Sequence, residues 1–138
     1  MSENLETAKL FTDACDNGKG WEVCSQYCNP DATFTVQAGA LADIATLEGY
    51  VEWAKGLLTP MPDARYELRF CAEDEARGSV AVYSVFHGTH TGEGGPIEPS
   101  GKAVATDYVY VMQFEDGRIR SLNKIWNDSF ALQQLGWA

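Results

Sequence analysis

Hydroxyl and amide side chains recur at even spacing in two stretches near the end of the chain. The first stretch carries Thr106, Tyr108 and Tyr110, and the second carries Asn123 and Asn127. Such groups can hold the oxygen atoms of a small molecule, and a tyrosine hydroxyl can also donate to an oxygen that gains negative charge. These residues are therefore candidates for binding a small oxygen-containing compound, provided that they share one face of a sheet.

The dipeptide Asp116-Gly117 lies between the two stretches and predicts a two-residue hairpin turn. In that register Glu115 faces Arg118. The predicted pairs on the polar face are Thr106–Asn127, Tyr108–Ile125, Tyr110–Asn123, Met112–Ser121 and Phe114–Ile119. This face is apolar near the turn and mixed toward its other end, which is typical of ligand pockets. The same polar groups could instead be core residues satisfied by hydrogen bonds to loops.

The opposite face of this hairpin combines apolar and charged side chains, which is typical of a subunit interface. In the predicted register an ion pair between Asp107 and Lys124 is expected there. The residues expected on that face are Asp107, Val109, Val111, Gln113, Arg120, Leu122, Lys124 and Trp126.

Two further groups of candidates come from other elements. Tyr50 and Trp53 share an apolar stripe of a predicted helix over residues 46–58, where they could cover a cavity or simply pack in the core. His87, in a predicted strand over residues 79–91, could be catalytic or an ordinary imidazole.

The predicted elements are helices first and strands afterwards, which indicates an α+β fold in a single domain over residues 1–138. Two more helices are expected before residue 28, the first ended by Asn17-Gly18 and the second spanning Trp21 to Tyr27. The predicted strands cover residues 33–37, 65–72, 79–91, 103–115 and 118–127.

Composition and charge narrow the possible partners and the compartment. A net charge of −10 argues against nucleic acid and anionic membrane surfaces and favours a neutral ligand. The chain has no apolar run long enough to span a membrane, and its start resembles no signal peptide, so a cytoplasmic protein is expected. The four cysteines are expected to be reduced, buried thiols rather than ligands of a metal.

Four short motifs, "GTHTGE", "PSGK", "FEDGRI" and "LQQLG", occur in this order. Together they resemble the SnoaL-like, polyketide-cyclase-like branch of the NTF2-like superfamily, most closely over residues 86–137. The resemblance implies a cone in which N-terminal helices pack in a strongly curved, mostly antiparallel sheet around a hydrophobic cavity. It also implies a homodimer formed through the convex face of the sheet.

In cyclases of this branch, an aspartate at the end of the last strand acts as general acid and base in an aldol ring closure, without cofactor or metal. Counted back from "QQLG", that position falls on Asn127, one residue before Asp128. Either a shift of the strand end turns Asp128 inward as the catalytic residue, or the acid/base is missing. Asp128 could also cap the final helix.

The resulting hypothesis is a cofactor-free enzyme of the lyase or isomerase class, acting on a hydrophobic carbonyl compound. Asp128 is its catalytic candidate, and the residues expected to bind substrate are Thr106, Tyr108, Tyr110, Asn123, Asn127, Tyr50, Trp53 and His87. The alternative is a non-catalytic, ligand-binding or dimeric scaffold protein with the same cavity.

Overall fold

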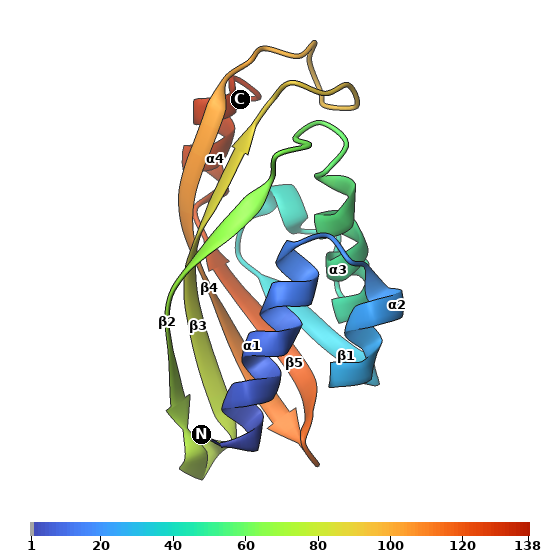
Figure 1. Ribbon diagram of the computed structural model, residues 1–138, viewed down its shortest axis with the longest axis vertical. Coiled ribbons are helices and arrows are strands. Elements are labelled where there is room, and N and C mark those ends of the chain that lie inside the picture. Colours follow the sequence, from blue (N-terminus) through green and yellow to red (C-terminus); the bar gives the residue numbers. More distant parts are fainter. Residues whose placement is uncertain (1) are drawn as a thin grey trace.

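Four α-helices and five strands make up an α+β fold in the computed structural model, which describes residues 2–138 (Figure 1). The helices are α1 (Glu3–Asp16), α2 (Trp21–Cys24), α3 (Leu47–Gly56) and α4 (Asp128–Leu135). The strands are β1 (Cys28–Val36), β2 (Arg65–Asp74), β3 (Ser79–Thr89), β4 (Ala103–Glu115) and β5 (Arg118–Trp126). Within the described residues, no helix is long and apolar enough to cross a membrane.

The five strands form one sheet in the order β1-β5-β4-β3-β2. β1 runs parallel to β5, and the other neighbours are antiparallel. The long strands β3 and β4 bend along their length, so the sheet is strongly curved (Figure 1). The expected fold class, with helices against a curved and mostly antiparallel sheet, is therefore confirmed.

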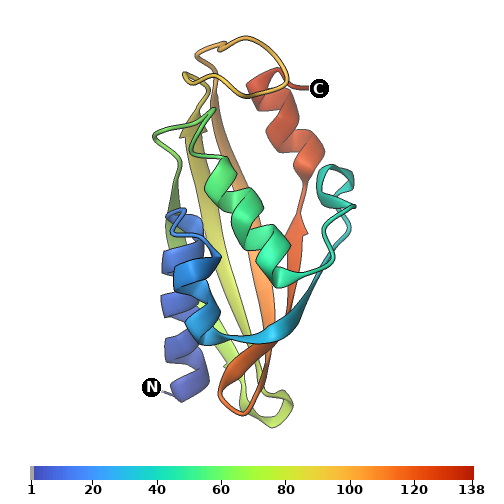
Figure 2. The same cartoon turned by 90° about the vertical axis from the view of Figure 1, so that its right-hand side faces the viewer.

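The longer helices α1, α3 and α4 all lie on one face of this sheet (Figure 2). Side-chain caps begin each of them: Ser2 accepts from the Leu5 amide, Thr46 from the Gly49 amide and Asn127 from the Phe130 amide. The core between helices and sheet buries large side chains such as Phe11, Leu47 and Met112. The pairing of two copies through the other face of the sheet stays a prediction.

The first strand is longer than the sequence suggested. It begins at Cys28, directly after the residues predicted as the second helix, so Asn29-Pro30 lies within the strand. Because β1 is at the edge of the sheet, a proline that donates no hydrogen bond is tolerated there.

The hairpin turn is confirmed, but the predicted register holds for only two pairs. Asp116 and Gly117 have φ angles of 53° and 78°, and Glu115 pairs with Arg118 as expected. After the Phe114–Ile119 pair a β-bulge adds one residue to β5, so that Gln113 faces Ser121. The side chains of Arg120 and Ser121 both donate to Gln113 Oε1, which holds the bulge.

This bulge exchanges the two faces of β5, because a shift of one residue reverses every side chain of a strand. Leu122, Lys124 and Trp126 point inward, whereas Asn123 and Ile125 point outward and are exposed. Lys124 pairs with Tyr110 in the ladder, not diagonally with Asp107. The predicted outer position of Lys124 and the predicted inner position of Asn123 are therefore both wrong.

Candidate active site

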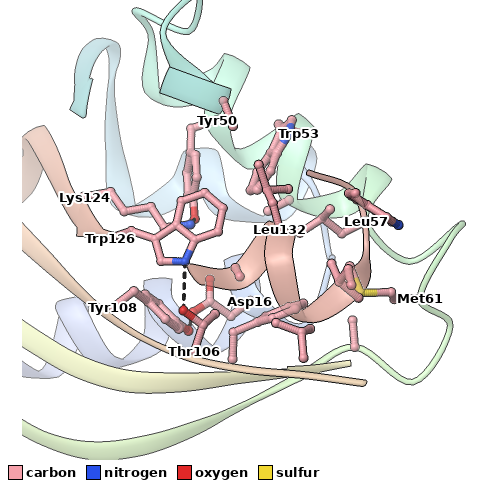
Figure 3. A pocket seen from close by; sticks show the side chains of 18 of the residues that line it. Asp16, Tyr50, Trp53, Leu57, Met61, Thr106, Tyr108, Lys124, Trp126 and Leu132 are labelled. Atoms are coloured by element: carbon pink, nitrogen blue, oxygen red, sulfur yellow. Dashed lines mark hydrogen bonds between the residues drawn. The ribbon is translucent and has the colours of Figure 1, made fainter. Parts of the chain in front are cut away.

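A cavity of about 230 Å³ lies between the inner face of the sheet and helices α3 and α4 (Figure 3). Its wall is mostly apolar, with contributions from Leu57, Met61 and Leu132. Trp126 Nε1 donates a hydrogen bond of 3.2 Å to Thr106 Oγ1 across the wall. The polar groups that reach the cavity come from Asp16, Tyr50, Thr106, Tyr108, Tyr110 and Lys124.

Asp16 is the last residue of α1, and it brings a carboxylate into this apolar setting. Its Oδ1 accepts a hydrogen bond of 2.7 Å from the Tyr110 hydroxyl, and its Oδ2 accepts one from the Tyr108 hydroxyl. Burial raises the pKa of the Asp16 carboxyl, and the two tyrosine donors and Lys124 oppose that rise. A carboxylate with a raised pKa is a stronger base than an exposed one.

Three hydroxyl and amine groups continue from Asp16 as a hydrogen-bonded chain. Tyr50 Oη lies 2.5 Å from Tyr110 Oη, and Lys124 Nζ donates to Tyr50 Oη over 3.0 Å. Because the ammonium can only donate and Tyr110 donates to Asp16, the Tyr50 hydroxyl must donate to Tyr110. Every donor therefore points from Lys124 toward Asp16, and a proton can move along the chain between the two ends.

Lys124 is almost fully buried, with 6% of its surface exposed. Its Nζ lies 4.2 Å from the ring centre of Trp126, 5.0 Å from that of Tyr50 and 5.1 Å from that of Trp53. None of the ion pairs among residues 2–138 includes Lys124. Burial accordingly lowers the pKa of Lys124 from 10.5 to about 8, although the charge of Asp16 acts in the opposite direction.

This lowered pKa predicts a pH-dependent stability with a definite sign. Unfolded Lys124 binds its proton more tightly than folded Lys124, so the penalty for burying the charge is present below pH 8 and is lost as the pH rises toward 10.5. The free energy of unfolding of the wild type, relative to Lys124→Met, should therefore increase by about 2 kcal/mol between pH 8 and pH 10. Urea unfolding of both proteins at several pH values measures this difference, and parallel curves would contradict it.

Comparison with known proteins assigns the chain to a family. The sequence profile of the SnoaL-like polyketide cyclase family matches residues 6–135. The chain belongs to this family. The resemblance inferred from its four short motifs is thus confirmed. A comparison with curated proteins found no significant match.

Solved structures of other proteins share the fold of this SnoaL-like chain. IdmH from Streptomyces antibioticus, provisionally assigned as a polyketide cyclase, is 22% identical with a TM-score of 0.81, over 98% of this chain and 99% of its own. AclR from Streptomyces galilaeus, provisionally assigned as a hydroxylase, is 21% identical with a TM-score of 0.80. The match covers 100% of this chain and 87% of AclR. A provisionally assigned polyketide cyclase from Acidithiobacillus ferrooxidans is 21% identical with a TM-score of 0.79, over 99% and 96%. These likenesses establish the NTF2-like cone fold, and the differing assignments show that the fold leaves the reaction open.

Five of the nine predicted site residues line the cavity of this SnoaL-like protein. Two come from α3 and three from β4, and they are Tyr50, Trp53, Thr106, Tyr108 and Tyr110. The structure places them at the cavity, and the roles assigned to them stay predictions.

Asp128 and Asn127 lie outside the cavity lining and serve the start of α4 instead. Asn127 Oδ1 accepts from the Phe130 amide over 3.1 Å, so Asn127 is the helix cap. Asp128 Oδ2 accepts from the Ala40 amide over 2.8 Å, and its Oδ1 accepts from the Ser129 amide. The expected inward turn of Asp128 is not found. The bulge does shift the register of β5 by one residue, but the strand ends at Trp126 and Asp128 already begins α4.

Asn123 and His87 also lie away from the cavity lining. The bulge turns Asn123 outward, to a shallow groove that it shares with Val111 and Arg120. His87 follows the cavity residue Phe86 in β3, so its side chain points to the other face, where its Nε2 lies 3.2 Å from Glu67 Oε1.

Asp16 was not among the residues predicted for the site, and Lys124 was predicted on the wrong face of the sheet; these two are the charged groups of the site. The position of Asp16 in the sequence could have indicated a functional role. An acidic residue in the last turn of a helix lies at the negative end of the helix dipole, where its charge is unfavourable. The inward position of Lys124 could have been predicted only together with the bulge, because an uninterrupted register from the turn places Lys124 on the outer face of the sheet.

Proposed function

We propose that this SnoaL-like protein is a small-molecule enzyme of the lyase or isomerase class that moves a proton next to the carbonyl group of a hydrophobic compound. Aldol ring closure and double-bond isomerisation both need this step. The observation that carries the proposal is the Asp16 carboxylate, which is held by two tyrosine hydroxyls inside an apolar cavity. The polyketide cyclase assignments of related structures support ring closure as the reaction.

The cavity volume indicates the size of the reacting part of the substrate. A dry protein cavity of about 150 Å³ accommodates benzene. The cavity of about 230 Å³ therefore suits one or two rings of a substrate. Its apolar wall and the net charge of −10 favour a neutral compound over an anion.

Asp16 is the proposed general base. A carboxylate offers about four lone-pair directions, and the two tyrosine hydroxyls occupy two of them, so an acidic C–H of the ligand can still meet an oxygen. The raised pKa of Asp16 improves its match to a carbon acid near neutral pH.

The Lys124 end of the hydrogen-bonded chain is the proposed partner of the carbonyl oxygen. As the C–H proton moves to Asp16, negative charge grows on that oxygen, and the ammonium of Lys124 can stabilise it and donate a proton. Once the hydroxyls of Tyr110 and Tyr50 have rotated to donate toward Lys124, the same chain returns the proton from Asp16 to Lys124. Acid and base are thus restored without a metal or a cofactor in the steps described.

The test is hydrogen exchange on a ketone that fits the cavity. 2-Tetralone, a two-ring ketone, is incubated with the protein in deuterated buffer, and NMR follows the loss of its α-hydrogen signals. Exchange that is faster than in buffer and saturates with ketone concentration is expected. Saturable binding without faster exchange would overturn the proposal in favour of a ligand-binding protein without catalysis.

A further inference from the structure

Lys124 is the candidate for a covalent role in this cavity. The chain has five lysines, and Lys124 is the only one among the described residues that line the cavity. The other four, Lys9, Lys19, Lys55 and Lys102, are exposed or partly exposed.

We propose that Lys124 forms an imine with the carbonyl group of the ligand, so that the carbonyl is held by a covalent bond and not only by hydrogen bonds. This inference deepens the proposed function and rests on it, since it presupposes a carbonyl compound in the cavity. Its ligand class is a neutral, hydrophobic ketone or aldehyde.

The surroundings of Nζ suit a nucleophilic amine. The hydrogen bond to Tyr50 Oη, 3.0 Å long, uses one N–H and leaves the nitrogen lone pair free once the ammonium has lost a proton. The aromatic rings of Trp126, Trp53 and Tyr108, with centres 4.2 to 5.3 Å from Nζ, keep water away from the amine, whereas the charge of Asp16 favours the ammonium. Desolvation by such walls is a recognised way to activate a lysine toward carbonyl groups.

The hydrogen-bonded chain supplies the proton transfers that imine formation needs. The ammonium of Lys124 first passes one proton through Tyr50 and Tyr110 to Asp16, which leaves a neutral amine and a protonated carboxyl. The Nζ lone pair then bonds to the carbonyl carbon, and the π electron pair moves to oxygen. That oxygen takes a proton from the Tyr50 hydroxyl while nitrogen returns one to Tyr50. The hydroxyl group then leaves as water with a proton that passes from protonated Asp16 through Tyr110 and Tyr50. The nitrogen lone pair forms the C=N bond, which leaves a protonated imine and an Asp16 carboxylate.

In this product the electron-accepting nitrogen is bonded to the ligand, and the Asp16 carboxylate is available as a base for the same ligand. The positive nitrogen withdraws electrons more strongly than a carbonyl oxygen, so the neighbouring C–H becomes more acidic. Asp16, at the other end of the chain, is then ready to remove that proton and give an enamine. The lowered pKa of Lys124, about 8, agrees with this role because a larger share of the amine is neutral near pH 7.

Reductive trapping tests the inference. The full chain is incubated with 2-tetralone and sodium cyanoborohydride at pH 7, and the protein is analysed by intact mass and by peptide mapping. A stable adduct with the mass of the ketone less one oxygen is expected on Lys124. Its yield there should exceed the yield on each exposed lysine by on the order of tenfold or more, because the exposed amines are almost fully protonated. Mapping of the wild type needs no variant, since the other lysines serve as internal controls.

Two matched variants complete the design. Lys124→Met should lose the adduct, and Lys55→Met, which changes an exposed lysine in α3, should keep it. Equal labelling of all lysines, or no adduct on Lys124, would overturn the imine. If α-hydrogen exchange still occurs in that case, the proposed function stands with a carbonyl held by hydrogen bonds alone. An adduct on Lys124 without exchange would support the imine and overturn the proton transfer.

Discussion

Asp16→Asn is expected to slow protein-catalysed hydrogen exchange on 2-tetralone by a factor of about 10²–10⁴, the range that a positioned general base contributes. Asparagine has nearly the same shape, and its amide oxygen can still accept from the hydroxyl of Tyr108 or Tyr110, so the fold should persist. The amide cannot take a proton from carbon, however. The measurement is the exchange rate by NMR at saturating ketone, with circular dichroism to verify folding.

Asp128→Asn is the matched control, because it makes the same chemical change at the aspartate that the sequence nominated as the catalytic residue, next to the family position at Asn127. Asp128 lies outside the cavity lining, and an asparagine there can still accept from the Ala40 amide. Its exchange rate should equal that of the wild type. A loss in Asp128→Asn with full activity in Asp16→Asn would assign the base to Asp128 and contradict the proposed site.

Tyr110→Phe is expected to lower the same exchange rate by about 10- to 100-fold, since a proton relay contributes to general acid–base catalysis. The change removes the hydroxyl that joins Tyr50 to Asp16, so the proton held by Asp16 can no longer return to Lys124 through the protein. The rate is again measured by NMR, under conditions that saturate the cavity.

Tyr108→Phe distinguishes two roles of the tyrosines, which are proton transfer along the hydrogen-bonded chain and hydrogen bonding that only holds the Asp16 carboxylate in place. Both tyrosines donate a hydrogen bond to this carboxylate, but only Tyr110 also contacts the Tyr50 hydroxyl. Tyr108→Phe should therefore keep a rate within a few-fold of the wild type. Equal losses in the two variants would show that the hydroxyls only hold the carboxylate and that the chain carries no proton.

Local patterns predicted most of the fold because each element has its own signal. The cap residues Ser2 and Thr46 are of types that commonly begin helices, and Asp116-Gly117 forms the predicted turn. The period of two in β4 also placed Tyr108 and Tyr110 correctly on the inner face. Each of these features is determined by residues that are close together in sequence, so it can be predicted from the sequence alone.

The charged half of the site depends on contacts between distant segments. Asp16 meets Tyr108 and Tyr110 across more than 90 positions of sequence, which no local pattern encodes. Ile119 and Leu122 do hint at the bulge in β5, because both are fully buried although their spacing of three residues does not fit an uninterrupted strand. The buried positions of Lys124 and Trp126 follow from that one added residue.

Carbon-13 NMR titration of the Asp16 side-chain carboxyl tests most directly whether the cavity contains a carboxylate prepared to act as base. The Asp16 signal, assigned by comparison with Asp16→Asn, should titrate with a pKa above the ordinary aspartate value of 3.8, and its midpoint should shift when 2-tetralone is added. A midpoint at the ordinary value that does not respond to the ketone would contradict the placement of the base at Asp16.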